Sequence, residues 1–120
     1  ALDLNNPANK TFVSEFEKTY KRLPSVYAAQ GYDTALILDA AIRGAKGNLS
    51  DKDALRKQLR EVKFDSVRGG FKFNTNHYPI QNYYLREIQK DAQGRLVNRI
   101  VGQPIMANHG DAYVKDCPMK

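Results

Sequence analysis

Hydrophobic side chains recur at every fourth position near the start of the chain, which predicts an amphipathic helix. Phe12, Phe16 and Tyr20 share one face of such a helix, and we expect them to pack in the core. The Asn-Pro pair at 6–7 suits the N-cap and the first helical position. The Leu-Pro pair at 23–24 predicts the end of the helix, because the residue before a proline is disfavoured in the α region.

A second helix is predicted from Ser25 to about Ala45, with Gly47 as its stop signal. Apolar residues occupy most of its circumference, so we expect it to be central and covered on several sides. Its first turns carry a cluster of polar and aromatic residues, namely Tyr27, Gln30, Tyr32 and Asp33.

A third, shorter helix is predicted after residue 50. Ser50 and Asp53 resemble a capping box, with Asp in place of Glu at the third helical position. Leu55, Leu59 and Val62 then follow with helical spacing, as expected of an amphipathic surface helix.

Beyond the third helix the hydrophobic period changes from 3.6 to 2, which predicts strands. Alternation is seen at 71–73 and again over 83–88. Residues 91–94 are typical of a turn, and 95–101 would be the returning strand of a hairpin. The tail from 102 to 120 has two prolines and few apolar residues, so we expect it to be irregular.

The predicted order of elements leaves the second helix without a sheet to pack on. Three helices precede the strands, and no βαβ unit or apolar parallel strand is predicted. We therefore expect the chain to be a truncated or proteolysed fragment of a longer protein. We also expect the isolated fragment to self-associate, because a second copy would cover the exposed apolar surface.

Composition and charge exclude several functional classes. The 120 residues carry a net charge of +6, which invites a nucleic-acid reading, but the 19 basic residues are scattered among 13 acidic ones. We expect a solvated surface and no nucleic-acid partner. The longest apolar stretch, 35–42, is interrupted by Asp39 and is far shorter than the ~20 residues that span a bilayer.

The residues that could carry catalysis or bind a metal are few. Cys117 is the only cysteine and His77 and His109 are the only histidines, and none of them has a metal-ligand spacing. A thiol nucleophile built from His109, Asp111 and Cys117 would lie in a polar tail with little to support it. We expect no enzyme activity, no cofactor and no metal; Cys117 is interpreted as a free thiol or as the partner of a cysteine outside this chain.

Three segments of the chain resemble one known family. They are 9–20, 24–35 with its Tyr-Ala-Ala-x-x-Tyr-Asp helix start, and 64–81 with its Gly-Gly-Phe-x-Phe strand. Together they are similar to the C-terminal portion of a periplasmic solute-binding protein of the branched-chain-amino-acid (type I) ABC-transporter family. The Asn-His-x-Pro-Ile-Gln variant at 76–81 is most similar to members that bind aromatic acids.

The resemblance implies an α/β fold: the C-terminal part of the second lobe of a bilobal protein, with three helices followed by a β-hairpin. Residues 1–106 would form the lobe fragment with the last hinge strand and the hairpin, and 107–120 an irregular tail. Such proteins close on a ligand between two lobes and deliver it to a transporter permease. Localisation in the periplasm would follow, with a signal peptide in the missing N-terminal part. The fragment alone is not expected to bind ligand.

The resemblance also suggests which residues meet the ligand. Tyr27 falls at a position that the family uses near the ligand, where its ring could stack or its hydroxyl donate to a carboxylate. Gln30 and Tyr32 are the other ligand-binding candidates, with core packing, capping or a surface role as the alternatives. Asn76 and His77 are interpreted as shaping the crossover before the hinge strand.

The expected ligand is a small organic anion. We favour an aromatic carboxylate, otherwise a branched-chain amino acid. An amino acid needs an acid for its ammonium group, and Asp33, the only acid near the helix start, is expected to point away from the face of Tyr27. An alternative function is that of a ligand-sensing domain in a receptor or regulator that uses the same fold.

Overall fold

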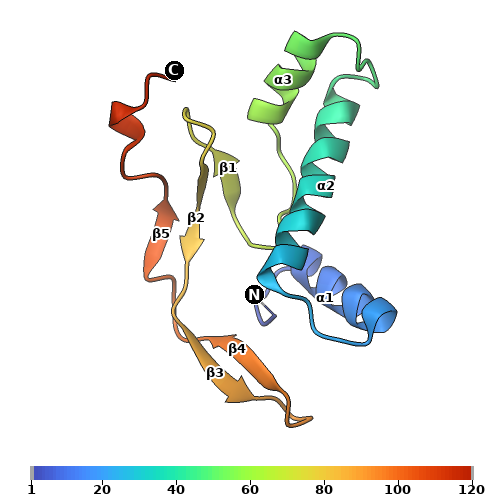
Figure 1. Ribbon diagram of the computed structural model, residues 1–120, viewed down its shortest axis with the longest axis vertical. Coiled ribbons are helices and arrows are strands. Elements are labelled where there is room, and N and C mark those ends of the chain that lie inside the picture. Colours follow the sequence, from blue (N-terminus) through green and yellow to red (C-terminus); the bar gives the residue numbers. More distant parts are fainter. Residues whose placement is uncertain (1, 120) are drawn as a thin grey trace.

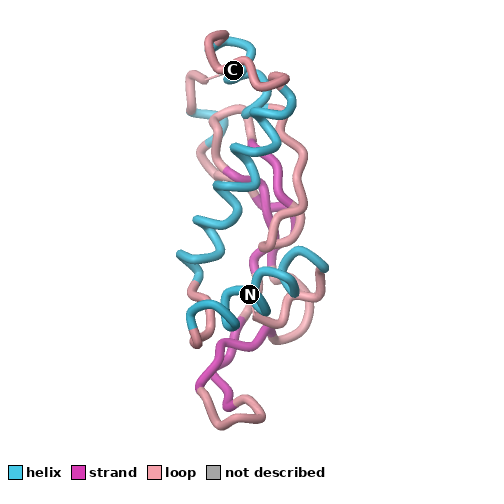
Figure 2. Tube along the Cα trace, turned by 90° about the vertical axis from the view of Figure 1, so that its right-hand side faces the viewer, coloured by secondary structure: helices cyan, strands magenta, loops and turns pink. Residues whose placement is uncertain are grey.

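The computed structural model describes residues 2–119, and its helices and strands lie in two layers (Figures 1 and 2). In Figure 1, α2 and α3 occupy one side, β1, β2 and β5 the other, and the hairpin of β3 and β4 extends beyond α1. The elements are α1 (Pro7–Tyr20), α2 (Val26–Gly44), α3 (Lys52–Arg60), β1 (Phe71–Phe73), β2 (Pro79–Tyr83), β3 (Arg86–Lys90), β4 (Leu96–Ile100), β5 (Met106–His109) and the 3₁₀ turn Val114–Asp116.

The first two helices begin where their caps predict. The side chain of Asn6 accepts a hydrogen bond from the Asn9 N–H at 2.6 Å, and the Ser25 hydroxyl accepts one from the Ala28 N–H at 3.2 Å. The first helix ends at Tyr20, three residues before the expected Leu-Pro boundary, because Lys21 turns into the left-handed region with a φ of 55°.

The cap of α3 differs from the prediction by one residue. Asp51, not Ser50, is the N-cap, and its Oδ1 accepts a hydrogen bond from the Ala54 N–H at 2.9 Å. A carboxylate at this position satisfies a free backbone donor and also interacts favourably with the positive end of the helix.

The strands form two separate antiparallel sheets instead of one hairpin. The first sheet has the order β1-β2-β5, and the second consists of β3 and β4. The hairpin prediction is confirmed for β3 and β4, but the single strand expected over 83–88 is wrong, since it divides into the end of β2 and the start of β3. The register of β2 against β5 shifts between Gln81 and Tyr83, which marks a β-bulge or similar irregularity in the pairing.

The expectation of an irregular tail is also incorrect in part. Met106–His109 forms β5, which pairs with the free edge of β2. This pairing joins segments 23 to 28 residues apart, and the tail has no local alternation that would predict a strand. The strand forms because the free edge of β2 offers unpaired backbone groups. The division of the chain at residue 106 stays a prediction.

The hydrophobic core is small and lies where α1 crosses the start of α2. Its buried members are Phe12, Ala29 and Val67, with Ala8, Val13, Phe16 and Ala28 packed against them. The radius of gyration is 16.6 Å, against about 14 Å for a compact domain of this length. The solvent-accessible surface is 8678 Å², against about 6,600 Å² expected for a folded monomer of this mass.

The excess surface includes much of α2. Val26, Leu38 and Ile42 of this helix are 52%, 47% and 37% exposed, so the described residues do not cover α2 on several sides as expected. The predicted lack of a sheet for this helix to pack on accounts for the difference. Among the helices of residues 2–119, none combines the length and the hydropathy of a membrane-spanning segment.

Candidate ligand-binding site

A cleft of about 720 Å³ lies between the helices α1 and α2 on one side and the strands β2 and β4 on the other. This volume is in the range of small-molecule sites, about 300–1,000 Å³. Its apolar lining includes Phe12, Val13 and Ala29 from the core. The polar and charged lining residues are Asn9, Ser25, Gln30, Arg68, Gln81, Asn82, Tyr83, Tyr84, Arg86 and Asn98.

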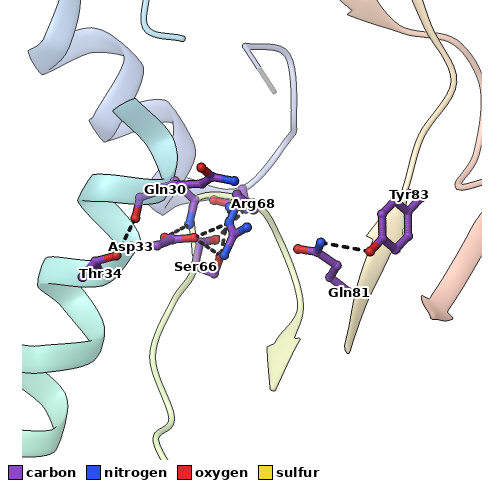
Figure 3. Close-up of polar contacts among 9 residues, drawn as sticks. Gln30, Asp33, Thr34, Ser66, Arg68, Gln81 and Tyr83 are labelled. Atoms are coloured by element: carbon purple, nitrogen blue, oxygen red, sulfur yellow. Dashed lines mark hydrogen bonds and ion pairs between the residues drawn. The ribbon is translucent and has the colours of Figure 1, made fainter. Parts of the chain in front are cut away.

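One wall of the cleft is held in place by Asp33 of α2. Its carboxylate is 1% exposed and accepts hydrogen bonds from the Ser66 hydroxyl at 2.7 Å, the Val67 N–H at 2.9 Å and Arg68 Nε at 2.9 Å (Figure 3). These bonds satisfy both carboxylate oxygens and pair the buried charge. They fasten the segment 66–68, which precedes β1, to the side of α2.

Arg68 is oriented by two contacts. Its Nε pairs with Asp33, and its guanidinium lies over the Phe71 ring at 5.2 Å from the centroid. The side chain is 22% exposed and lines the cleft. A guanidinium held along one edge in this way keeps the donors of its other edge in a fixed direction.

Strand β2 supplies polar groups to the opposite wall. The Gln81 amide nitrogen donates to the Tyr83 hydroxyl at 3.3 Å. In Figure 3, Gln81 extends from β2 toward Arg68, and Gln30 extends from α2 toward the same guanidinium. The cleft therefore brings together side chains from α2, from the segment before β1 and from β2.

The three residues predicted to bind ligand lie in different surroundings. Gln30 is exposed and lines the cleft, while its backbone oxygen accepts a hydrogen bond from the Thr34 hydroxyl at 2.9 Å. Tyr27 lies in the first turn of α2, is 78% exposed and is not part of the cleft lining. The ring of Tyr32 packs against Phe12 with a centroid separation of 4.9 Å. The structure thus brings only Gln30 directly to the cleft.

Asn76 and His77 lie in the turn between β1 and β2. His77 has a φ of 62°, and the amide nitrogen of Asn76 donates to Asp111 at 2.8 Å. The described contacts of this pair form a tight turn and attach it to the segment after β5. Both are absent from the lining of the cleft.

Sequence reasoning overlooked Arg68, Gln81 and Tyr83. Arg68 belongs to the Val-Arg-Gly-Gly motif at 67–70, which indicated the family but no role for the arginine. No feature of the neighbouring sequence identifies Arg68 as the partner of Asp33, 35 residues earlier. The available signal was the buried-helix position of Asp33, because an acid there requires a cationic or hydrogen-bonding partner.

The electrostatic character of the cleft is positive. Arg68 and Arg86 line it, and among the described residues no aspartate or glutamate does. Asp33 lies behind Arg68, fully engaged in its three hydrogen bonds. Within residues 2–119 no group of three His, Cys, Asp or Glu side chains could hold a metal ion.

Comparison with known proteins identifies the family. A family model described as "Periplasmic binding protein" matches residues 1–93. The chain belongs to this family. The membership confirms the predicted resemblance and the predicted α/β fold class, because the three helices and the strands match part of a periplasmic binding protein fold.

Two solved structures share the arrangement of this family member. One is a solute-binding protein of an ABC transporter from R. palustris, in complex with benzoate; it is 38% identical with a TM-score of 0.73, and the match covers 88% of this chain and 28% of that chain. The other is an ABC transporter substrate-binding protein from Sphaerobacter thermophilus, with 23% identity, a TM-score of 0.79 and coverage of 89% and 30%. The second match supports the fold alone. The chain spans less than a third of either structure, and no curated protein matches it.

Proposed function

We propose that this protein is the solute-binding component of an ABC transporter and captures a small aromatic carboxylate for import. The observation that carries the proposal is the positive cleft: two arginines and no acid line it among the described residues. The R. palustris structure, which is 38% identical over most of this chain, holds benzoate and adds support for the ligand class.

The charges of the cleft favour a carboxylate that carries no ammonium group. A branched-chain amino acid would need an anionic partner for its ammonium, since a buried unpaired charge is costly. Asp33 does not serve this purpose, because it is 1% exposed and its oxygens accept bonds from Ser66, Val67 and Arg68. An aromatic acid needs no such partner from this wall.

We assign ligand contacts to the residues predicted from the sequence according to their positions. The Gln30 side chain would hydrogen-bond the ligand from the wall of the cleft. Tyr27 would present its exposed ring, beyond the cleft, to a ligand held between this portion and the rest of the protein. Tyr32 would act from behind the lining by fixing Phe12, whose ring it contacts.

The partners follow from the same proposal. The full-length protein would lie in the periplasm, with a signal peptide ahead of this portion, and would pass its ligand to a transporter permease. A sensing domain of a receptor or regulator is not favoured, because the 38% identical R. palustris structure is a transporter component.

Ligand screening of the full-length protein tests the proposed function. We expect benzoate and related aromatic acids to raise the melting temperature, since a ligand that binds only the folded state stabilises it. Tyr27→Ala is expected to weaken benzoate binding by more than about 1 kcal/mol through loss of a stacking partner. Tyr113→Ala, which removes an exposed tyrosine after β5, is the matched control. A shift with leucine, isoleucine or valine and none with aromatic acids would contradict the assignment.

The isolated 120-residue chain provides a separate test of the exposed apolar surface. We expect it to self-associate, because α2 leaves Val26, Leu38 and Ile42 partly exposed. Light scattering at several concentrations measures this directly. A 13.6 kDa monomer at every concentration would rule out self-association.

A further inference from the structure

The guanidinium of Arg68 has donors that the fold itself does not use. Its Nε is paired with Asp33 at 2.9 Å, but within residues 2–119 its two Nη atoms make no hydrogen bond. The side chain nevertheless lies mostly covered, with 22% of its surface exposed, on the wall of the 720 Å³ cleft. A partly desolvated cation that lines a cleft and has donors left over is suited to bind an anion.

The contacts around Arg68 reduce the conformational entropy that its side chain would lose on binding a ligand. Asp33 fixes one edge of the guanidinium and Phe71 lies against its face, so little side-chain freedom remains to be lost when a ligand binds. Asp33 is itself held by Ser66 and by the Val67 N–H, so its position does not depend on Arg68 alone. The arrangement presents two parallel N–H donors, the geometry that matches the two oxygens of a carboxylate.

The other arginine of the cleft differs in these respects. Arg86 begins β3 and is exposed, and no hydrogen bond or ion pair holds its side chain among the described residues. It would lose more rotamer freedom on binding an anion. The amides of Gln30 and Gln81, which extend toward Arg68 in Figure 3, line the same cleft and could add hydrogen bonds to an anion held by Arg68.

We propose that Arg68 binds the carboxylate of the ligand with its two Nη atoms, and that Asp33 positions Arg68 for this contact. The inference rests on the proposed function and adds the residue that selects a carboxylate over a neutral group. The aromatic ring of the ligand would then point away from Arg68, along the apolar lining that Phe12, Val13 and Ala29 provide.

The test compares benzoate with benzamide, which has the same ring and no charge. Binding of both to the full-length protein is measured by calorimetry and by ligand-observed NMR. In Arg68→Gln we expect the affinity for benzoate to fall by about tenfold to a hundredfold, the effect of losing charge-assisted hydrogen bonds. The affinity for benzamide is expected to change little, so the preference for the anion is lost.

Two further variants keep the test decisive. Arg56→Gln makes the same change of charge at an exposed position of α3, away from the cleft, and is expected to leave both affinities unchanged. If Arg68→Gln does not fold, because it leaves Asp33 buried without its cation, the double variant Asp33→Asn with Arg68→Gln removes both charges together and is compared in its place.

Each outcome separates this inference from the function on which it rests. Unchanged benzoate affinity in the folded Arg68 variant, or an equal loss of benzoate and benzamide, would overturn the role of Arg68 while leaving the solute-binding function standing. A selective loss of benzoate in Arg86→Gln but not in Arg68→Gln would overturn it as well. A wild-type protein that binds neither benzoate nor any other aromatic acid would instead contradict the proposed function, and the inference would fail with it.

Discussion

Two ion-pair networks attach strands to helices in this chain, and they use the same chemistry in different surroundings. In the first, buried Asp33 of α2 holds Arg68 and the segment before β1. In the second, Arg95 at the start of β4 pairs with Glu17 of α1 and with Asp91 of its own turn, the latter at 2.7 Å. The side chains of Arg95 and Glu17 are 41% and 40% exposed, whereas Asp33 is 1% exposed.

Burial changes what each pair contributes. Removing one partner of a buried pair leaves an uncompensated charge and typically costs about 3–5 kcal/mol, whereas an exposed pair contributes about 0–1 kcal/mol. Asp33 also accepts a hydrogen bond from the Val67 N–H, so its carboxylate holds the backbone of the segment before β1 as well as the Arg68 side chain. The cleft wall at Arg68 is therefore firmly held, while the β3–β4 hairpin is attached more weakly. Four predictions test this difference.

The largest effect is expected from Asp33→Ala. It leaves Arg68 without its anion and Val67 N–H without an acceptor, so the free energy of unfolding should fall by about 3–5 kcal/mol. Urea unfolding of the full-length protein measures it. Asp39→Ala, which breaks the exposed pair with Arg43 on the same helix, is the matched control and should cost less than about 1 kcal/mol. Equal effects of the two variants would show that burial does not separate them.

A smaller loss is expected from Ser66→Ala, which leaves both charges in place. The Ser66 hydroxyl donates to Asp33 and accepts from the Arg68 N–H at 3.0 Å, so its removal leaves the Arg68 N–H unpaired and leaves Asp33 Oδ2 with Arg68 Nε as its remaining donor. We expect a loss of about 1–3 kcal/mol in the free energy of unfolding. Ser50→Ala, at an exposed position before α3, is the control and should be close to neutral. A Ser66→Ala variant as stable as wild type would mean that Asp33 and Arg68 need no third partner.

Arg95→Ala should cost less than Asp33→Ala, because Arg95 and Glu17 are 41% and 40% exposed. The Asp91 side chain is 7% exposed, but without the Arg95 side chain it still accepts hydrogen bonds from the Gln93 and Arg95 N–H groups, both at 2.9 Å. The Asp3 carboxylate also still accepts a hydrogen bond from the Ile100 N–H at 2.8 Å. The difference from wild type should also shrink at high salt, which screens exposed charges. Unfolding at low and high ionic strength measures both. A loss of unfolding free energy that is as large as that of Asp33→Ala and independent of salt would show that the two networks contribute equally to stability.

The smallest effect concerns Asp91. Its partial burial raises its pKa, but hydrogen bonds from the Arg95 side chain and from the Arg95 and Gln93 N–H groups outweigh this, and the pKa of Asp91 is lowered overall. A lowered pKa in the folded state stabilises the fold above the unfolded pKa of about 3.9, and this contribution is lost as the pH falls through the folded pKa.

Carbon-13 NMR titration of the Asp91 carboxyl group measures this directly. We expect a midpoint below about 3.9 and a hairpin that loosens in acid as Asp91 becomes protonated. Asp91→Asn should abolish this part of the acid response, and a midpoint above the unfolded value would reverse the predicted sign.

The sequence predicted the helices well because their determinants are local. Asn6 and Ser25 cap α1 and α2 through hydrogen bonds to residues three positions on. The strand β5 and the partners of Asp33 could not be predicted in the same way, since each contact joins residues more than 20 positions apart. Among the residues that line the cleft, Gln30 could be singled out from its polar character at the start of an apolar helix, and its ligand contact stays a prediction. Arg68 could not, because its position depends on Asp33, a partner that only the fold brings near.

The bond between Asp33 and Arg68 also defines a closed loop within the chain. The two residues are 35 positions apart, and the segment between them contains the rest of α2 and all of α3. The entropy lost on closing a loop grows slowly with its length, by about 0.6 kcal/mol for each doubling. The exposed connection at 46–51 could therefore gain several residues with little effect on the cleft wall, and variation in length among related proteins can accumulate there while the position of Arg68 is kept.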